Sequence, residues 1–96
     1  MAAYLIADTD LFDPARYEEY KVRAKAIAEK YGGQYLARGG QLSVKESDLW
    51  SPTRVVIVRF ESFEQANKFY DSPEYQAILH FSQESAKRTV MVVEGI

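Results

Sequence analysis

The order in which strand-like and helix-like segments follow one another is the feature of this sequence that most narrows its possible folds. Short apolar runs indicate strands, and apolar residues at helical spacing indicate amphipathic helices. Along the chain they run strand, helix, strand, strand, helix, helix, strand, at residues 4–8, 13–31, 34–38, 54–60, 62–70, 72–79 and 89–93. This is the split βαβ, ferredoxin-like order, so we predict one α+β domain, residues 1–96, with a four-stranded antiparallel sheet.

We predict the helix starts from residues that accept hydrogen bonds from the free N–H groups of a first turn. Asp13 and Ser72 each stand before a proline, the pairing that helix starts favour. Ser62 and Gln65 match a capping box, in which the Gln65 side chain reaches back to Ser62. Residues 41–50 are less regular. We expect a long hairpin connection there, with one short extra strand as an alternative.

The third predicted strand is apolar on both of its faces, because Val55, Val56, Ile57 and Val58 follow one another. Both faces of the sheet therefore favour burial. A chain of 96 residues has helices for only one face. We expect the other face to be buried in a homodimer, in which the sheets of two protomers pack against each other.

Composition and charge argue against several classes of function. The chain has 12 basic and 14 acidic residues, and a net charge of −2 disfavours a nucleic-acid partner. Without cysteine, with one histidine and without the glycine order of a nucleotide-binding loop, we expect no metal and no cofactor. The sequence starts without a basic leader, and its apolar runs fall far short of the ~20 residues of a membrane helix. We expect a cytoplasmic protein with no membrane partner.

Arg38, Arg54 and His80 are the candidates for polar chemistry. Arg38 ends the second predicted strand and Arg54 begins the third, where a guanidinium can hold a carboxylate or an enolate. His80 is the only histidine, and its side chain can take up and release a proton near neutral pH. The structural alternatives are ion pairs with nearby acids for the arginines and a place on a helix surface for His80.

Four of the seven tyrosines are candidates for the wall of a binding pocket, because a tyrosine combines an apolar ring with a polar hydroxyl. Tyr17 and Tyr20 lie on the first predicted helix, and Tyr70 and Tyr75 flank the start of the last helix. The alternative for each of them is packing in the core.

Several motifs together resemble a known family. They are Tyr17 and Tyr20, the glycine pair at 32–33, the strand at 35–39, the run 59–66, its continuation 69–76 with Phe-Tyr-x-Ser-Pro-Glu-Tyr, and the closing residues 93–95. Over nearly the whole chain these residues resemble the domain of unknown function family thirteen-thirty, in the dimeric α/β-barrel superfamily. The resemblance implies a ferredoxin-like protomer and a dimer whose two sheets form a barrel. The family has no established reaction, so the resemblance assigns no catalytic residues.

Two hypotheses for function follow from these residues. In the first, each protomer of a homodimer binds or converts a small organic molecule, carbonyl or anionic, in a cleft between helices and sheet. Arg38 would orient this molecule, His80 would move a proton, and the tyrosines would line the cleft. In the second, the protein is a non-catalytic dimeric module, structural or regulatory, whose apolar faces serve assembly alone. The sequence leaves open whether the protein is an enzyme.

Overall fold

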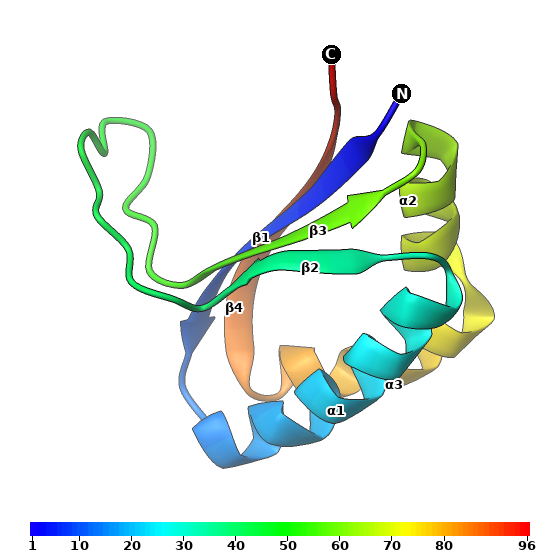
Figure 1. The fold of residues 1–96 in the computed structure, drawn as a ribbon. Coiled ribbons are helices and arrows are strands. Elements are labelled where there is room, and N and C mark those ends of the chain that lie inside the picture. Colours follow the sequence, from blue (N-terminus) through cyan, green and yellow to red (C-terminus); the bar gives the residue numbers. More distant parts are fainter.

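The structure, a computed structural model, describes residues 1–96 and has the predicted order of elements (Figure 1). These are β1 (Ala3–Leu11), α1 (Pro14–Lys30), β2 (Gln34–Arg38), β3 (Val55–Phe60), α2 (Phe63–Asp71), α3 (Pro73–Gln83) and β4 (Ala86–Glu94). Every strand pair is antiparallel, and the sheet order is β2-β3-β1-β4. The predicted α+β, ferredoxin-like fold is confirmed.

The first and last strands along the chain, β1 and β4, are longer than predicted. β1 and β4 pair over nine residues each, from Ala3 opposite Glu94 to Leu11 opposite Ala86. The apolar runs in the sequence do not include these extensions, because several of the added residues have polar side chains, such as those of Thr9 and Arg88. A strand continues as long as its backbone groups find partners, whatever the polarity of its side chains.

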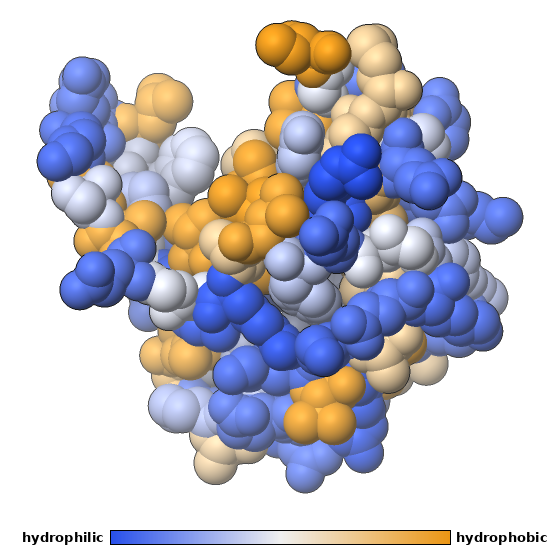
Figure 2. Space-filling view, in the orientation of Figure 1, coloured by the Kyte–Doolittle hydropathy of each residue, from blue (hydrophilic) through white to orange (hydrophobic).

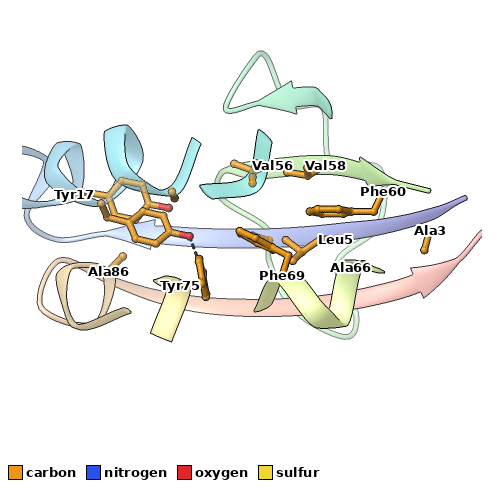
Figure 3. Close-up of a cluster of buried hydrophobic side chains, with 14 residues drawn as sticks. Ala3, Leu5, Tyr17, Val56, Val58, Phe60, Ala66, Phe69, Tyr75 and Ala86 are labelled. Atoms are coloured by element: carbon orange, nitrogen blue, oxygen red, sulfur yellow. Dashed lines mark hydrogen bonds between the residues drawn. The ribbon is translucent and has the colours of Figure 1, made fainter. Parts of the chain in front are cut away.

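The three helices cover one face of the sheet, and the core lies between them (Figures 1 and 3). Alternate residues of β1 and β3 point into this core. Its centre is a row of aromatic rings in which Phe60 stacks on Phe69 at 5.3 Å between centroids and Phe69 lies 4.7 Å from Tyr75. Tyr20 continues the row from α1 and lies 6.1 Å from Tyr75.

The predicted helix starts are confirmed, with one correction. Asp13, Ser62 and Ser72 each accept a hydrogen bond from the backbone N–H three residues further on, at 3.1, 3.0 and 3.2 Å. The Gln65 side chain does not complete the predicted capping box. It donates instead to the carbonyl oxygen of Tyr31 at 2.9 Å, where α1 ends and its last carbonyls lack helical partners. None of the three helices has the length and apolar character that crossing a membrane requires.

The second face of the sheet carries no helix. Near its middle, Ile6 of β1 lies opposite Ile57 of β3 on one side and Met91 of β4 on the other. Met91 and Val93 are exposed. Figure 2 shows hydrophobic residues gathered over the strands, between the projecting loop and the hydrophilic surface of the helices. The chain exposes 6098 Å², more than the roughly 5,600 Å² of a folded monomer of this mass.

Residues 39–54 form a long connection between β2 and β3 that projects from the domain (Figure 1), and we call it the arm. The predicted long hairpin connection is confirmed, and the alternative of a short extra strand is not. The base of the arm is held by Asp8, whose carboxylate accepts from the Trp50 indole at 2.8 Å and from the Thr53 and Arg54 backbones at 2.8 and 3.1 Å. Burial alone would raise the pKa of Asp8, but these hydrogen bonds outweigh it and lower the pKa below its ordinary value.

Candidate functional site

A pocket between α1 and the helix-covered face of the sheet is the candidate site, and we call it the tyrosine pocket. Its walls combine aliphatic, aromatic and basic side chains. They are Leu5, Ala7, Ala24, Val56, Val58 and Phe69, then Tyr17, Tyr20, Tyr35 and Tyr75, and finally Lys21, Arg38, Arg54 and Arg88. Such a mixture, mostly apolar with a few polar groups that converge, is typical of sites for small organic molecules.

A bulge in β2 brings Arg38 into this pocket. Tyr35 lies opposite Val58 and Ala37 lies opposite Ile57, so Leu36 is an extra residue without a partner. In a regular strand, side chains three residues apart point to opposite faces. The extra residue changes that relation, and both Tyr35 and Arg38 point to the helix-covered face.

Arg38 and Arg54 have little to hold them in place. The Arg38 guanidinium lies 4.8 Å from the Tyr35 ring and donates one hydrogen bond, of 2.9 Å, to the Lys21 carbonyl. The Arg54 guanidinium lies 5.7 Å from the Tyr17 ring. Gly39 makes room for it, because a Cβ at this position would lie 2.7 Å from Arg54 Nε. The ion pairs predicted as alternatives do not form, since neither guanidinium is paired with a carboxylate.

Arg88 of β4 occupies the inner end of the pocket with two tyrosines. It donates to the hydroxyl oxygen of Tyr20 at 2.9 Å and to that of Tyr75 at 3.0 Å. The two hydroxyls also bond to each other at 2.7 Å, the dashed contact in Figure 3. Burial raises the pKa of Tyr20 well above its ordinary value, so the hydroxyl keeps its proton at neutral pH. Burial would lower the pKa of Arg88, but the two tyrosines reverse that effect and raise it.

All charged side chains that line the pocket are positive. Four of its 14 lining residues are basic and none is acidic. Among them only Lys21 has an ion pair, at 3.2 Å from Glu18 on the outer surface of α1. The other hollows of the surface lack this convergence, and the one beside Asp8 and Thr53 is lined by no hydrophobic residue. No group of three histidine, aspartate or glutamate side chains is placed to hold a metal ion.

The free space among these side chains is small. The cavity volume is about 30 Å³, which is room for little more than a water molecule. A larger molecule needs side chains to move. Arg38 and Arg54 are the ones with the fewest contacts to break, because neither is ion-paired and neither is fully buried.

The structure brings together five of the seven residues that the sequence suggested for a site. These are Tyr17, Tyr20, Tyr75, Arg38 and Arg54.

Tyr70 and His80 lie elsewhere. Tyr70 packs behind Tyr75, with 5.1 Å between ring centroids, and lines a separate, more open groove beside β4. His80 is exposed on α3, where its ring lies 4.2 Å from that of Phe81. It lines no part of the tyrosine pocket, so the structure does not bring it together with Arg38.

Sequence reasoning missed Arg88, Tyr35 and Lys21. Arg88 lay outside the predicted last strand, which was expected to begin at residue 89. Alternation carried one step further would have found it, because Arg88 shares its strand face with Val90 and Val92. Lys21 carries no such signal in the sequence, since it reads as one of several charged residues on the outer side of a helix.

Comparisons with known proteins place the chain in a family and a fold. A family model described as "Domain of unknown function (DUF1330)" matches residues 2–96. No curated protein matches the sequence. Among solved structures, a protein of unknown function from Rhodopseudomonas palustris is 14% identical with a TM-score of 0.75, and the match covers 99% of this chain and 82% of that one.

Two further solved structures share the fold at low identity. SnoaB, a cofactor-independent oxygenase from Streptomyces nogalater, is 11% identical with a TM-score of 0.70, over 99% of this chain and 93% of that one. A dimeric ferredoxin-like protein of unknown function from Thermobifida fusca is 13% identical with a TM-score of 0.56, over 99% of this chain and 92% of that one.

Proposed function

This chain belongs to the DUF1330 family, and we propose that it binds a small organic molecule with an anionic or carbonyl oxygen in the tyrosine pocket. The observation that carries the proposal is the charge of the pocket. Three arginines and a lysine converge on aromatic and aliphatic walls, with no carboxylate among the lining residues. A ligand with a negative oxygen and an apolar body would complement both properties.

Arg38 and Arg54 are the residues that would meet such a ligand first. Each guanidinium carries five N–H donors, and that of Arg38 makes one hydrogen bond, to the Lys21 carbonyl. Neither side chain is ion-paired, so each can turn toward an incoming oxygen without breaking a salt bridge. His80 has no part in this proposal, because it is exposed on another surface.

We also propose that the functional unit is a homodimer whose two open sheet faces pack together. The apolar residues Ile6, Ile57 and Met91 at the middle of this face support the proposal, as does the dimeric ferredoxin-like protein that shares the fold. A stable interface buries roughly 800 Å² on each partner, about an eighth of the 6098 Å² that the chain exposes. The tyrosine pocket lies on the opposite side of the sheet, so it stays open in such a dimer.

A non-catalytic dimeric module is the second candidate, and the size of the pocket favours it. A free volume of about 30 Å³ is far below the roughly 300 Å³ of the smallest usual ligand sites. In that case the buried tyrosines and Arg88 serve the core alone.

A binding titration separates the two candidates. The isotope-labelled protein is titrated with the aromatic carboxylate 4-nitrobenzoate and, separately, with 4-nitrophenolate, and backbone amide resonances are followed by NMR. We expect the largest shifts at Arg38, Arg54 and their neighbours. Arg38→Ala is expected to weaken binding roughly tenfold, because it removes a charge-assisted hydrogen bond.

Arg59→Ala is the matched control. Arg59 is an exposed arginine of β3 on the open sheet face, so its loss should leave binding unchanged. If neither probe shifts the resonances of the pocket, the proposal of a ligand site is wrong and the second candidate stands.

A further inference from the structure

In the cluster of Tyr20, Tyr75 and Arg88, the hydrogen-bond donors outnumber the acceptors that the cluster itself provides. Each tyrosine hydroxyl carries one hydrogen, and an arginine carries donors alone. The bond of 2.7 Å between the hydroxyls uses one of their two hydrogens, while Arg88 donates to both oxygens, at 2.9 and 3.0 Å. Whichever tyrosine donates, the hydroxyl hydrogen of the other has no acceptor within the cluster.

The rest of the pocket does not supply that acceptor. The charged groups of the lysine and of the other two arginines have no acceptor atoms, and the aliphatic walls have none either. The hydroxyl oxygens of Tyr17 and Tyr35 are acceptors, but neither is hydrogen-bonded to the cluster. Neither Tyr20 nor Tyr75 makes a further side-chain hydrogen bond. Both tyrosines line the pocket and are almost fully buried, with 8% and 2% of their surface exposed. A buried donor of this kind favours any partner that brings it an oxygen.

Arg88 determines which kind of oxygen fits. A carboxylate normally binds arginine through two oxygens, one on each terminal nitrogen. Here each terminal nitrogen of Arg88 already holds a hydroxyl oxygen, so the two tyrosines take the places of a carboxylate. The cluster therefore presents one hydroxyl hydrogen, strengthened by the positive charge behind it, and suits one charged oxygen.

We propose, on the premise of the ligand site described above, that the Tyr20–Tyr75–Arg88 cluster binds the single charged oxygen of a planar phenolate or enolate. The oxygen accepts the free hydroxyl hydrogen, as in an oxyanion hole. The rings of Tyr17, Tyr35 and Phe69 enclose the flat apolar body. Arg38 and Arg54 move aside to admit it and then lie over its outer end.

Two probes of similar size test this proposal on the unmodified protein. Both 4-nitrophenolate and 4-nitrobenzoate are flat anions, but the first ends in one oxygen and the second in two. We expect 4-nitrophenolate to bind at least about tenfold more tightly, because it alone fits the single donor. At a pH where free 4-nitrophenol is half ionised, adding protein should increase its phenolate absorbance.

Substitutions of the tyrosines test the hydrogen count itself. In Tyr20→Phe or Tyr75→Phe the mutual bond is lost, and the remaining hydroxyl, still held by Arg88, has a free hydrogen. Each single variant should therefore keep the preference for 4-nitrophenolate. The double variant has no hydroxyl hydrogen left in the cluster and should lose the preference, with affinity for 4-nitrophenolate at least about tenfold lower.

Tyr31→Phe is the matched control, since its hydroxyl bonds to Glu74 outside the pocket at 2.9 Å. Equal or tighter binding of 4-nitrobenzoate by the unmodified protein would overturn the phenolate proposal and leave the ligand site intact. Absence of binding by both probes would overturn both. If the double variant does not fold, the comparison of probes on the unmodified protein and on the single variants decides.

Discussion

Among single residues, Gly39 controls how closely the end of β2 approaches Arg54. Its φ is +72°, a left-handed conformation that residues with a side chain rarely adopt, and a Cβ there would lie 2.7 Å from Arg54 Nε. We expect Gly39→Ala to lower the free energy of unfolding by about 1 kcal/mol or more and to push the Arg54 guanidinium from its place at the pocket.

Gly40→Ala is the control for this prediction. Gly40 is the next residue, and a Cβ on it meets no atom within 4 Å. Its substitution should change the free energy of unfolding by less than about 0.5 kcal/mol. Urea denaturation of both variants measures the difference. Equal free energies of unfolding for the two variants would show that alanine adopts the Gly39 conformation without strain.

The residues of the site differ in how well the sequence predicts their place in the pocket. Tyr17, Tyr20 and Tyr75 follow from helical spacing, because each falls on the side of its helix that faces the core. Arg88 follows from strand alternation once the strand is extended to its true start at Ala86. Arg38 does not follow from alternation, since the bulge that turns it inward leaves no regular pattern.

Among the elements, the arm depends on Asp8 of β1. The pKa of this carboxyl is lowered in the folded protein, because hydrogen bonds from Thr53, Arg54 and Trp50 outweigh the opposing effect of burial. A lowered pKa means that ionised Asp8 stabilises the fold at pH values above the ordinary carboxyl pKa of about 4. This contribution is lost as the pH falls through the lowered value.

We expect Asp8→Asn to cost about 1 kcal/mol of unfolding free energy at pH 7, because the hydrogen bonds at the base of the arm lose their charge. The cost should begin to shrink as the pH falls below about 4, where Asp8 is protonated in the unfolded chain, and it should vanish once the pH is below the lowered pKa of the folded protein. Urea denaturation at pH 7, 4 and 3 gives both values. Asp10→Asn, at an exposed position of the same strand face, is the control. A cost that does not vary with pH would contradict the role of the charge.

Local sequence signals predicted the ends of the elements well where the cause is local. Helix starts at Asp13, Ser62 and Ser72 depend on one side chain and its own first turn, so the sequence alone predicts them. The partner of Gln65 could not be predicted in this way. Its side chain binds the carbonyl of Tyr31, 34 positions away in the sequence, a contact that exists only once α1 and α2 are packed.

At the scale of the whole molecule, the open sheet face makes the dimer testable. Ile57 lies near the middle of this face, opposite Ile6. We expect Ile57→Lys to place a charge in the interface and to convert a dimer into a folded monomer. Sedimentation velocity of both proteins at micromolar concentration measures the mass.

Val22→Lys is the matched control, because Val22 is an apolar residue of α1 that is 69% exposed on the opposite side of the molecule. This variant should sediment like the parent protein. A monomeric parent protein, or an Ile57→Lys protein that remains dimeric, would contradict assembly through the sheet.

The fold as a whole could be predicted because many weak signals agree on one order of elements. The candidate site could be predicted only in part. Its tyrosines and Arg38 belong to segments whose type was clear, but the pocket is lined by residues of all three helices, all four strands and the base of the arm. Which side chains meet across those elements depends on strand register, and register is a property of pairs of strands rather than of any one segment.

The unpaired Leu36 in β2 has a consequence for how this pocket can change in evolution. Loss of this single residue would return β2 to regular alternation. Tyr35 and Arg38 would then stand two positions apart, opposite Val58 and Val56, and both side chains would still face the helices. A related chain whose edge strand is one residue shorter can thus keep the same pocket residues, although the two sequences align there only with a gap.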